Sequence, residues 1–173
     1  SLLLEHLIKL SESKEEKLML MEKFLNSVTA TFYRQTMFAE YEKMAYETLE
    51  SGNPLTATEL KTAYKEIYAK YWGPAMFIDE EEEYTWARIP HFYYNFYVYQ
   101  YATGMAASEA LVNCVKNEGQ PAVDRYLQFL KSGKSKYSIE ILKDAGVDMA
   151  KPDAITAVIK KMERVLDEME SLL

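Results

Sequence analysis

Apolar side chains recur with a helical period along most of the chain, and the longest such run lies near its start. From Lys14 to Glu50 the sequence contains no glycine and no proline. Within this run the apolar positions are Leu18, Met21, Leu25, Val28 and Phe32 and, after a shift of phase, Met37, Tyr41, Met44 and Ala45. A return every three or four residues is typical of one face of a helix. The pattern predicts one very long helix over about 14–50, which ends where Gly52 and Pro54 follow.

Local signals at the helix ends predict the remaining elements. Ser13 with Glu16, and Thr56 with Glu59, have the spacing of a capping box, which marks the start of a helix. No segment alternates as a strand does, and no internal repeat is present. The sequence therefore predicts an all-α fold of about seven helices. Their expected ranges are 2–10, 14–50, 56–71, 91–117, 121–131, 138–144 and 153–172.

The stretch Ile89–Tyr101 holds five of the fourteen tyrosines and one of the two histidines. Pro90 is expected to open a helix in its first turn, because proline is tolerated there but costs a hydrogen bond further inside. A helix from His91 to about Asn117 would place His91, Tyr94, Val98 and Tyr101 on one face, with Tyr93, Tyr97 and Gln100 pointing away. Two interpretations follow: a tyrosine-rich core helix, or aligned donors that hold a carbonyl or an oxyanion. Composition alone does not choose between them.

Charge and cysteine content exclude several classes of partner. The net charge is −7 and no cluster of Lys and Arg is present, so we expect no nucleic-acid partner. No apolar run approaches the roughly 20 residues of a membrane span, so we expect no membrane partner. Cys114 stands alone, which favours a reducing, cytoplasmic location. The acidic run Asp79–Glu83 is interpreted as a solvated face.

The first residues suggest a piece of something larger. The sequence begins Ser1-Leu2-Leu3-Leu4, without an initiator methionine and with apolar residues from the second position. Natural termini are more often polar and loose. We expect residues 1–173 to form a single helical domain that belongs to a longer polypeptide. The apolar face of residues 2–10 should then lack its cover and promote self-association of the chain.

The residues alone do not supply a complete active site. Serine-nucleophile, glycine-rich nucleotide-binding and Cys-x-x-Cys motifs are all missing. His6 and His91 are too few and too far apart in sequence to form a zinc site. We therefore name no metal ligand in this sequence and expect this chain by itself to bind no cofactor.

Longer motifs add a family resemblance. Phe32–Glu42, Trp86–Tyr93 and Phe96–Gly104 resemble the C-terminal part of oligoendopeptidase F, a family of zinc peptidases similar to thimet oligopeptidase. The resemblance covers most of the chain and implies a mostly helical lobe of a peptidase whose channel admits short peptides. In this family a His-Glu-x-x-His helix and a later glutamate hold the zinc, and neither is present here. The resemblance therefore implies that zinc belongs to the full-length enzyme, and that this chain alone is inactive.

The resemblance also implies that this chain forms the wall of the peptide channel that faces the metal. His91 matches a histidine that binds the substrate in this family. Tyr94 and Tyr101 are the tyrosines chosen to bind the substrate and to donate to the oxyanion, because the expected helix places them on the face of His91. Tyr93, Tyr97 and Tyr99 stay open as alternatives, since the spacing from His to Tyr differs among branches of the family.

Two functions are therefore carried forward. The first is a C-terminal fragment of a zinc-dependent oligoendopeptidase that cleaves internal bonds of short peptides. Its partners would be those peptides and the missing catalytic part of the same protein. The second is a stand-alone helical binding or scaffold domain without catalysis.

Overall fold

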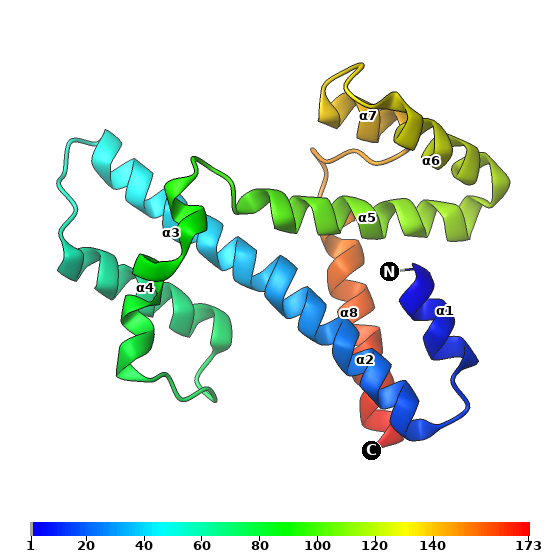
Figure 1. Cartoon of the computed structure of the whole chain (residues 1–173), viewed down its shortest axis with the longest axis horizontal. Coiled ribbons are helices and arrows are strands. Elements are labelled where there is room, and N and C mark those ends of the chain that lie inside the picture. Colours follow the sequence, from blue (N-terminus) through cyan, green and yellow to red (C-terminus); the bar gives the residue numbers. More distant parts are fainter. Residues whose placement is uncertain (1) are drawn as a thin grey trace. The chain divides into compact units, whose positions relative to one another are not determined.

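A computed structural model describes residues 2–173, and within these residues the ordered elements are helices, with no strand. This confirms the all-α prediction. The elements are α1 (Leu2–Leu10), α2 (Lys14–Val28), a π-helical turn (Thr29–Tyr33), α3 (Arg34–Glu50), α4 (Ala57–Trp72), the 3₁₀ helices η2 (Glu80–Arg88) and η3 (Pro90–Tyr93), α5 (Tyr99–Glu118), α6 (Gln120–Ser132), α7 (Ser138–Asp144) and α8 (Asp153–Leu172) (Figure 1).

The predicted long helix is confirmed, and its shift of phase has a structural cause. α2, the π-helical turn and α3 follow one another without a break from Lys14 to Glu50. A π-turn closes its hydrogen bonds over five residues and so inserts one extra residue into the α-helical repeat. The apolar stripe therefore moves by one position between Phe32 and Met37, which are both buried.

The predicted helix starts are also confirmed. The Ser13 hydroxyl accepts a hydrogen bond from the backbone N–H of Glu16 across 3.0 Å. At α4 the capping box is complete, because Thr56 and Glu59 exchange side-chain and backbone hydrogen bonds. Each cap satisfies backbone N–H groups that have no partner within the helix, and so sets where the helix begins.

The acidic run is only partly the solvated face that its composition predicts. Glu80 and Glu81 are exposed in η2. Glu83, in contrast, has a side chain only 11% exposed, and its carboxylate lies 2.6 Å from the ammonium of Lys61 on α4. The hydrogen bond from Lys61 lowers the pKa of Glu83 below its usual value. The run therefore also fastens η2 to α4.

The predicted helix over 91–117 is wrong in its first part. His91 lies in the short helix η3, residues 94–98 are not helical, and α5 begins only at Tyr99. Phe96 has a φ of 51°, and among residues 2–173 it is the only residue other than glycine with a positive φ. That conformation costs roughly 1–3 kcal/mol and ends a right-handed helix, so it persists only where the surroundings hold it.

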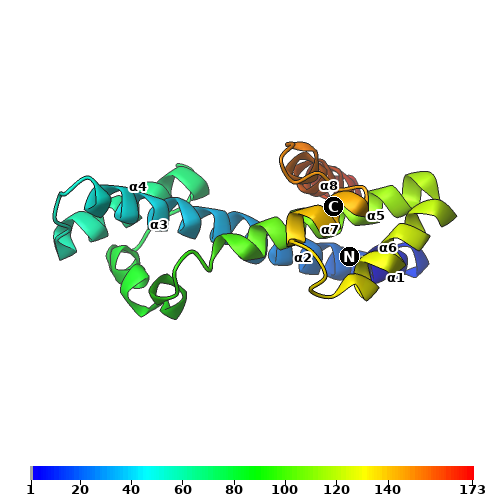
Figure 2. The same ribbon diagram turned by 90° about the horizontal axis from the view of Figure 1, so that it is seen from above.

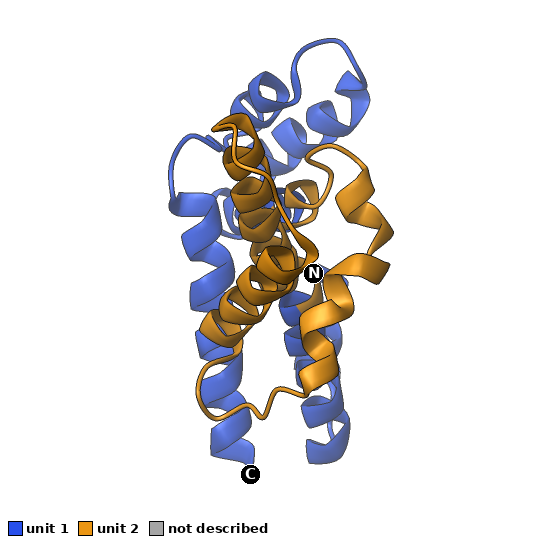
Figure 3. Cartoon of the chain, turned by 90° about the vertical axis from the view of Figure 1, so that its left-hand side faces the viewer, with its two compact units in different colours: residues 1–29, 103–173 blue, residues 30–102 orange. Residues whose placement is uncertain are grey.

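The chain divides into two compact units (Figure 3). Unit 1 contains residues 2–29 and 103–173, and unit 2 contains residues 30–102. In unit 1, α2 packs against α1 and α8, and α6 packs against α7. In unit 2, α4 packs against α3 and η2 (Figure 1 and Figure 2). No helix within residues 2–173 is both long and apolar enough to cross a bilayer.

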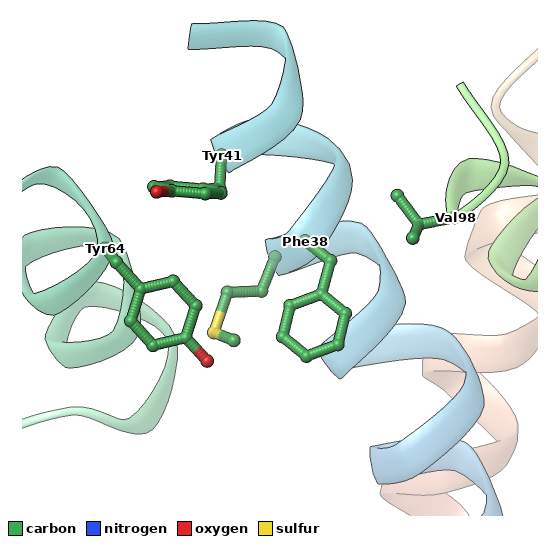
Figure 4. Close-up of a cluster of buried hydrophobic side chains, with 5 residues drawn as sticks. Phe38, Tyr41, Tyr64 and Val98 are labelled. Atoms are coloured by element: carbon green, nitrogen blue, oxygen red, sulfur yellow. The ribbon is translucent and has the colours of Figure 1, made fainter. Parts of the chain in front are cut away.

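Unit 2 has an aromatic core that supports the segment after η3. Met37, Phe38 and Tyr41 of α3, Tyr64 of α4 and Val98 form the buried cluster (Figure 4). The rings of Tyr41 and Tyr64 meet edge to face, with centroids 5.3 Å apart. Val98 is 0% exposed and directly precedes α5, so it fixes the end of the non-helical segment against α3.

Unit 1 contains a buried group of charges. The ammonium of Lys161 on α8 lies 2.7 Å from carboxylate oxygens of both Glu109 on α5 and Glu5 on α1. Lys161 is 6% exposed and Glu109 is 3% exposed. Charges this deeply buried are stable only when paired, so this network ties three helices of unit 1 together.

Candidate functional site

Three side chains between His91 and Tyr101 form a hydrogen-bonded group in unit 2, called here the His–Tyr cluster: His91, Tyr97 and Tyr101. The Nε2 atom of His91 lies 3.3 Å from the hydroxyl oxygen of Tyr101. The hydroxyl groups of Tyr101 and Tyr97 lie 3.2 Å apart, with Tyr101 as the donor. The imidazole also stacks on the ring of Tyr97, with centroids 5.5 Å apart. The ring of Tyr101 meets that of Tyr97 edge to face at 5.4 Å.

Each member of the cluster comes from a different kind of backbone. His91 is held on η3, which Pro90 begins, and Tyr101 lies in the first turn of α5. Tyr97 lies between them in the non-helical segment. The fold thus turns the chain back so that residues ten positions apart meet through their side-chain ends. A continuous helix would instead have separated them by almost three turns.

The direction of the hydrogen bonds determines which proton is left for a ligand. The Tyr101 hydroxyl has one proton, so when it donates to Tyr97 it can only accept from an N–H at Nε2 of His91. In that arrangement Tyr97 is the last acceptor and keeps its own O–H for an incoming group. The other imidazole tautomer reverses the order of donors. With Tyr101 as the donor, Tyr97 presents a free neutral O–H on a side chain that is 38% exposed. In the reversed order, the Tyr97 proton is used in its hydrogen bond to Tyr101.

The phenol of Tyr101 stays protonated over the physiological range. Its hydrogen bond with Tyr97, together with burial, raises the pKa of Tyr101 above the usual value. A protonated phenol donates a hydrogen bond without adding negative charge. Such a donor suits a carbonyl oxygen that gains negative charge during a reaction.

Tyr94 lies beside the cluster but outside its hydrogen bonds. Its ring meets that of Tyr97 edge to face at 6.1 Å. The side chain is 60% exposed, and within residues 2–173 its hydroxyl makes no hydrogen bond. The Tyr94 hydroxyl is therefore accessible to a ligand.

Comparison with known proteins gives this geometry its context. Residues 1–161 match the family model described as Peptidase family M3. The chain belongs to peptidase family M3.

Relatives within family M3 are oligopeptidases by their names. The chain is 48% identical to Oligopeptidase PepF of Bacillus subtilis over 173 residues, which is all of this chain and 26% of that protein. It is 41% identical to the plasmid-encoded Oligoendopeptidase F of Lactococcus lactis subsp. cremoris, again over all of this chain and 29% of that protein. The crystal structure of oligoendopeptidase-F from Enterococcus faecium matches with a TM-score of 0.94 at 39% identity, over 98% of this chain and 33% of that one. The chain thus spans about a quarter to a third of the length of these relatives.

Family M3 peptidases depend on zinc, but the residues described here do not fit that ion. Within residues 2–173 no three side chains of His, Cys, Asp or Glu come together in a way that could hold a metal. His6 is exposed on α1 in unit 1, and His91 is hydrogen-bonded to a phenol in unit 2. A zinc site needs three or four convergent protein ligands. We therefore derive no catalytic step through zinc from this chain.

For this M3 chain, the structure corrects the geometry behind the choice of site residues. His91 and Tyr101 do meet, but they meet because the chain folds back and not because they share a helical face. Tyr97, expected to point away from His91, stacks on it instead. No signal in residues 91–98 marks this arrangement, because the break at Phe96 falls on a residue that rarely adopts a positive φ.

Proposed function

We propose that this chain forms the substrate-binding side of a zinc-dependent oligoendopeptidase that hydrolyses internal bonds of short peptides. Membership of family M3 and the names of its relatives support a peptidase. The observation that carries the assignment of residues is the 3.3 Å approach of His91 Nε2 to the Tyr101 hydroxyl. This contact supports the proposal, because an imidazole and a neutral phenol this close together can act on one peptide.

In this proposal each polar group of the site has its own role. His91 holds the backbone of the bound peptide. Tyr94 donates to the oxygen of the scissile carbonyl as it becomes an oxyanion, and Tyr101 does so by turning its one proton from Tyr97 to that oxygen. Tyr97 adds a third hydroxyl within reach. Donors positioned before the reaction cost little reorganisation when the charge develops, so they stabilise the transition state more than the substrate.

The metal and its ligands belong, in this proposal, to a part of the polypeptide outside these 173 residues. The relatives are three to four times longer than the aligned segment, since that segment is 26% of one and 33% of another. The proposal therefore assigns peptide binding to this chain and the generation of the attacking water to the remainder.

The test compares two forms of the protein on a short, internally quenched fluorescent peptide. The protein from the complete reading frame should cleave an internal bond and lose this activity on chelation. It should also contain a His-Glu-x-x-His motif upstream of Ser1. The isolated 173-residue chain with added zinc should give no turnover, because two distant imidazoles leave the ion short of ligands.

Each contrary result points to a different error. Chelator-sensitive turnover by the isolated chain would mean that the active site lies within these residues. No turnover by the complete protein, with the motif absent, would favour the alternative of a helical binding domain without catalysis.

A further inference from the structure

Two residues of α3 hold the non-helical segment that precedes α5. The Oε1 atom of Glu42 accepts a hydrogen bond from the backbone N–H of Phe96 across 2.9 Å. One turn further along α3, the hydroxyl of Tyr46 donates to Oδ1 of Asn95 across 2.7 Å. The Tyr46 ring also packs on the ring of Phe96, with centroids 4.7 Å apart. Two neighbouring residues of the segment are therefore held by two side chains on one face of a single helix.

Glu42 is an unusual residue at this depth. It is only 5% exposed, and within residues 2–173 it forms no ion pair. Burial raises the pKa of its carboxyl group, while the hydrogen bond from Phe96 opposes that rise. Burying a carboxyl group without a cationic partner is unfavourable unless its hydrogen bonds compensate. The hydrogen bond from the backbone N–H of Phe96 supplies this compensation for the Glu42 carboxyl group.

The hydrogen bond to Glu42 is donated by Phe96, the residue with the strained backbone in this segment. Phe96 has a φ of 51°, which an L-residue adopts only where its surroundings determine it. Glu42 binds the N–H of this residue, so it favours the orientation of the peptide group that the positive φ requires. Without the acceptor, the segment would be free to relax toward an ordinary backbone conformation.

The positive φ of Phe96 sets the directions of the next two side chains. Val98 enters the aromatic core and is 0% exposed. Tyr97, in contrast, stays outside the core and stacks on His91, where its hydroxyl meets that of Tyr101. The position of Tyr97 against His91 therefore depends on the backbone at Phe96, which Glu42 holds from 54 residues earlier in the chain.

We propose that Glu42 is a positioning residue of the His–Tyr cluster: by accepting the N–H of Phe96 it holds the left-handed turn that places Tyr97 on His91. Its importance for catalysis rests on the proposed function, but the geometric effect does not. Glu42 forms no hydrogen bond or ion pair with His91, Tyr97 or Tyr101, and acts through the backbone of residues 96–97.

Three substitutions separate the hydrogen bond from charge and volume. Glu42→Gln keeps an acceptor of the same length and removes the charge. Glu42→Met keeps the length and removes the acceptor. Glu42→Asp keeps the charge but shortens the side chain by one methylene, so the carboxylate withdraws from Phe96. Urea unfolding of each variant first establishes that it is folded.

The direct measurement is the NMR signal of the His91 imidazole in the 173-residue chain. The ring current of Tyr97 displaces this signal, and His6, exposed in unit 1, is an internal reference. We expect Glu42→Gln to leave the His91 signal in place. Glu42→Met and Glu42→Asp should move it toward that of His6, while His6 itself stays unchanged. If one of these two variants does not fold, the other decides the question.

A second measurement, in the complete enzyme, distinguishes the positioning role of Glu42 from the proposed catalytic role of the His–Tyr cluster. Glu42→Met should lower kcat by up to about 10²-fold with little change in KM, as expected when catalytic groups are misplaced by about 1 Å. Glu42→Gln should retain most of the activity. An unmoved His91 signal in both folded Met and Asp variants would overturn the role of Glu42, whatever the activity. A moved signal with unchanged kcat would confirm the positioning and would instead overturn the catalytic role of the cluster.

Discussion

The Nε2 atom of His91 and the hydroxyl oxygen of Tyr101 lie 3.3 Å apart, although η3 and α5 are separated by a non-helical segment. The contact joins the only histidine of unit 2 to a phenol whose pKa is raised by its hydrogen bond with Tyr97. A neutral donor next to an imidazole can serve a peptide carbonyl both before and during a reaction. This relationship leads to a first prediction about turnover.

Replacing Tyr101 by Phe in the complete enzyme should lower kcat far more than it changes KM. The substitution keeps the ring and removes only the hydroxyl that, in the proposed function, donates in the transition state. The loss of one such donor costs about 10²–10³-fold in kcat, or about 2.7–4 kcal/mol. A small change in KM is expected because binding common to substrate and transition state is retained. Steady-state kinetics on a quenched fluorescent peptide measure both constants.

Tyr93→Phe is the matched control for this substitution. The Tyr93 side chain is 71% exposed, and its hydroxyl donates to the carbonyl of Ala87, away from the His–Tyr cluster. Its kcat should stay near that of the parent enzyme. His91→Ala should lower kcat/KM with an unchanged zinc content. Equal losses in the Tyr93 and Tyr101 variants, or loss of zinc from the His91 variant, would contradict the assignment.

Removing the charge of Lys161 should strongly destabilise unit 1. Lys161→Met leaves the carboxylates of Glu109 and Glu5 without the ammonium that lies 2.7 Å from each. Breaking a buried pair on one side costs about 3–5 kcal/mol, because the remaining charge stays buried. Urea unfolding followed by circular dichroism should show a loss of this size.

A double variant separates this charge effect from a packing effect. Lys161→Met combined with Glu109→Gln removes both charges of the most buried pair, so it should recover part of the lost stability. If the double variant is less stable than Lys161→Met alone, the loss comes from packing and not from an unpaired charge.

High pH should destabilise the chain through its buried tyrosines. Burial, with the hydrogen bond to Glu40, raises the pKa of Tyr71 to about 12. The unfolded chain has the ordinary value of about 10, so it releases this proton at lower pH than the folded chain does. The stabilising effect is complete below about pH 10 and is lost as the pH rises through about 12. Burial acts in the same direction on the pKa of Tyr64 and of Tyr41.

The measurement compares urea midpoints at about pH 9 and about pH 11.5. Tyr71→Phe should lose less stability over this interval than the parent chain, because it has one fewer phenol to ionise. Tyr137→Phe is the control, since Tyr137 is 83% exposed. The same pH dependence in the parent and in Tyr71→Phe would count against the role of Tyr71.

The apolar face of α1 should cause the 173-residue chain to self-associate. α1 has no buried residue, and Leu3 and Leu10 are 69% and 62% exposed. Apolar surface of this kind promotes association when it is contiguous. The double variant Leu3→Gln and Leu10→Gln should shift the chain toward monomer in sedimentation velocity, whereas Leu49→Gln, on α3, should not. A parent chain that stays monomeric at high concentration would refute this prediction.

The sequence by itself determined the helices whose causes are local. Caps at Ser13 and Thr56 mark where helices begin, and the absence of glycine and proline from 14 to 50 predicts the long helix. The π-helical turn also affects the sequence pattern, because the apolar positions shift phase after Phe32. These features depend on residues within a few positions of one another, so the local sequence is enough to predict them. The family motifs likewise pointed to His91, whereas Tyr94 and Tyr101 were chosen from an expected helical face, and their roles stay a prediction.

Only the tertiary structure decided how that site is built. Residues 91–98 contain nothing after Pro90 that forbids a helix, so the pattern predicted one. The helix fails because Glu42 holds the N–H of Phe96 and Val98 enters a core made by α3 and α4. Both contacts join residues more than thirty positions apart, and their energy outweighs the local preference for continuing the helix. Tyr97 therefore joined His91 through packing that no local pattern encodes.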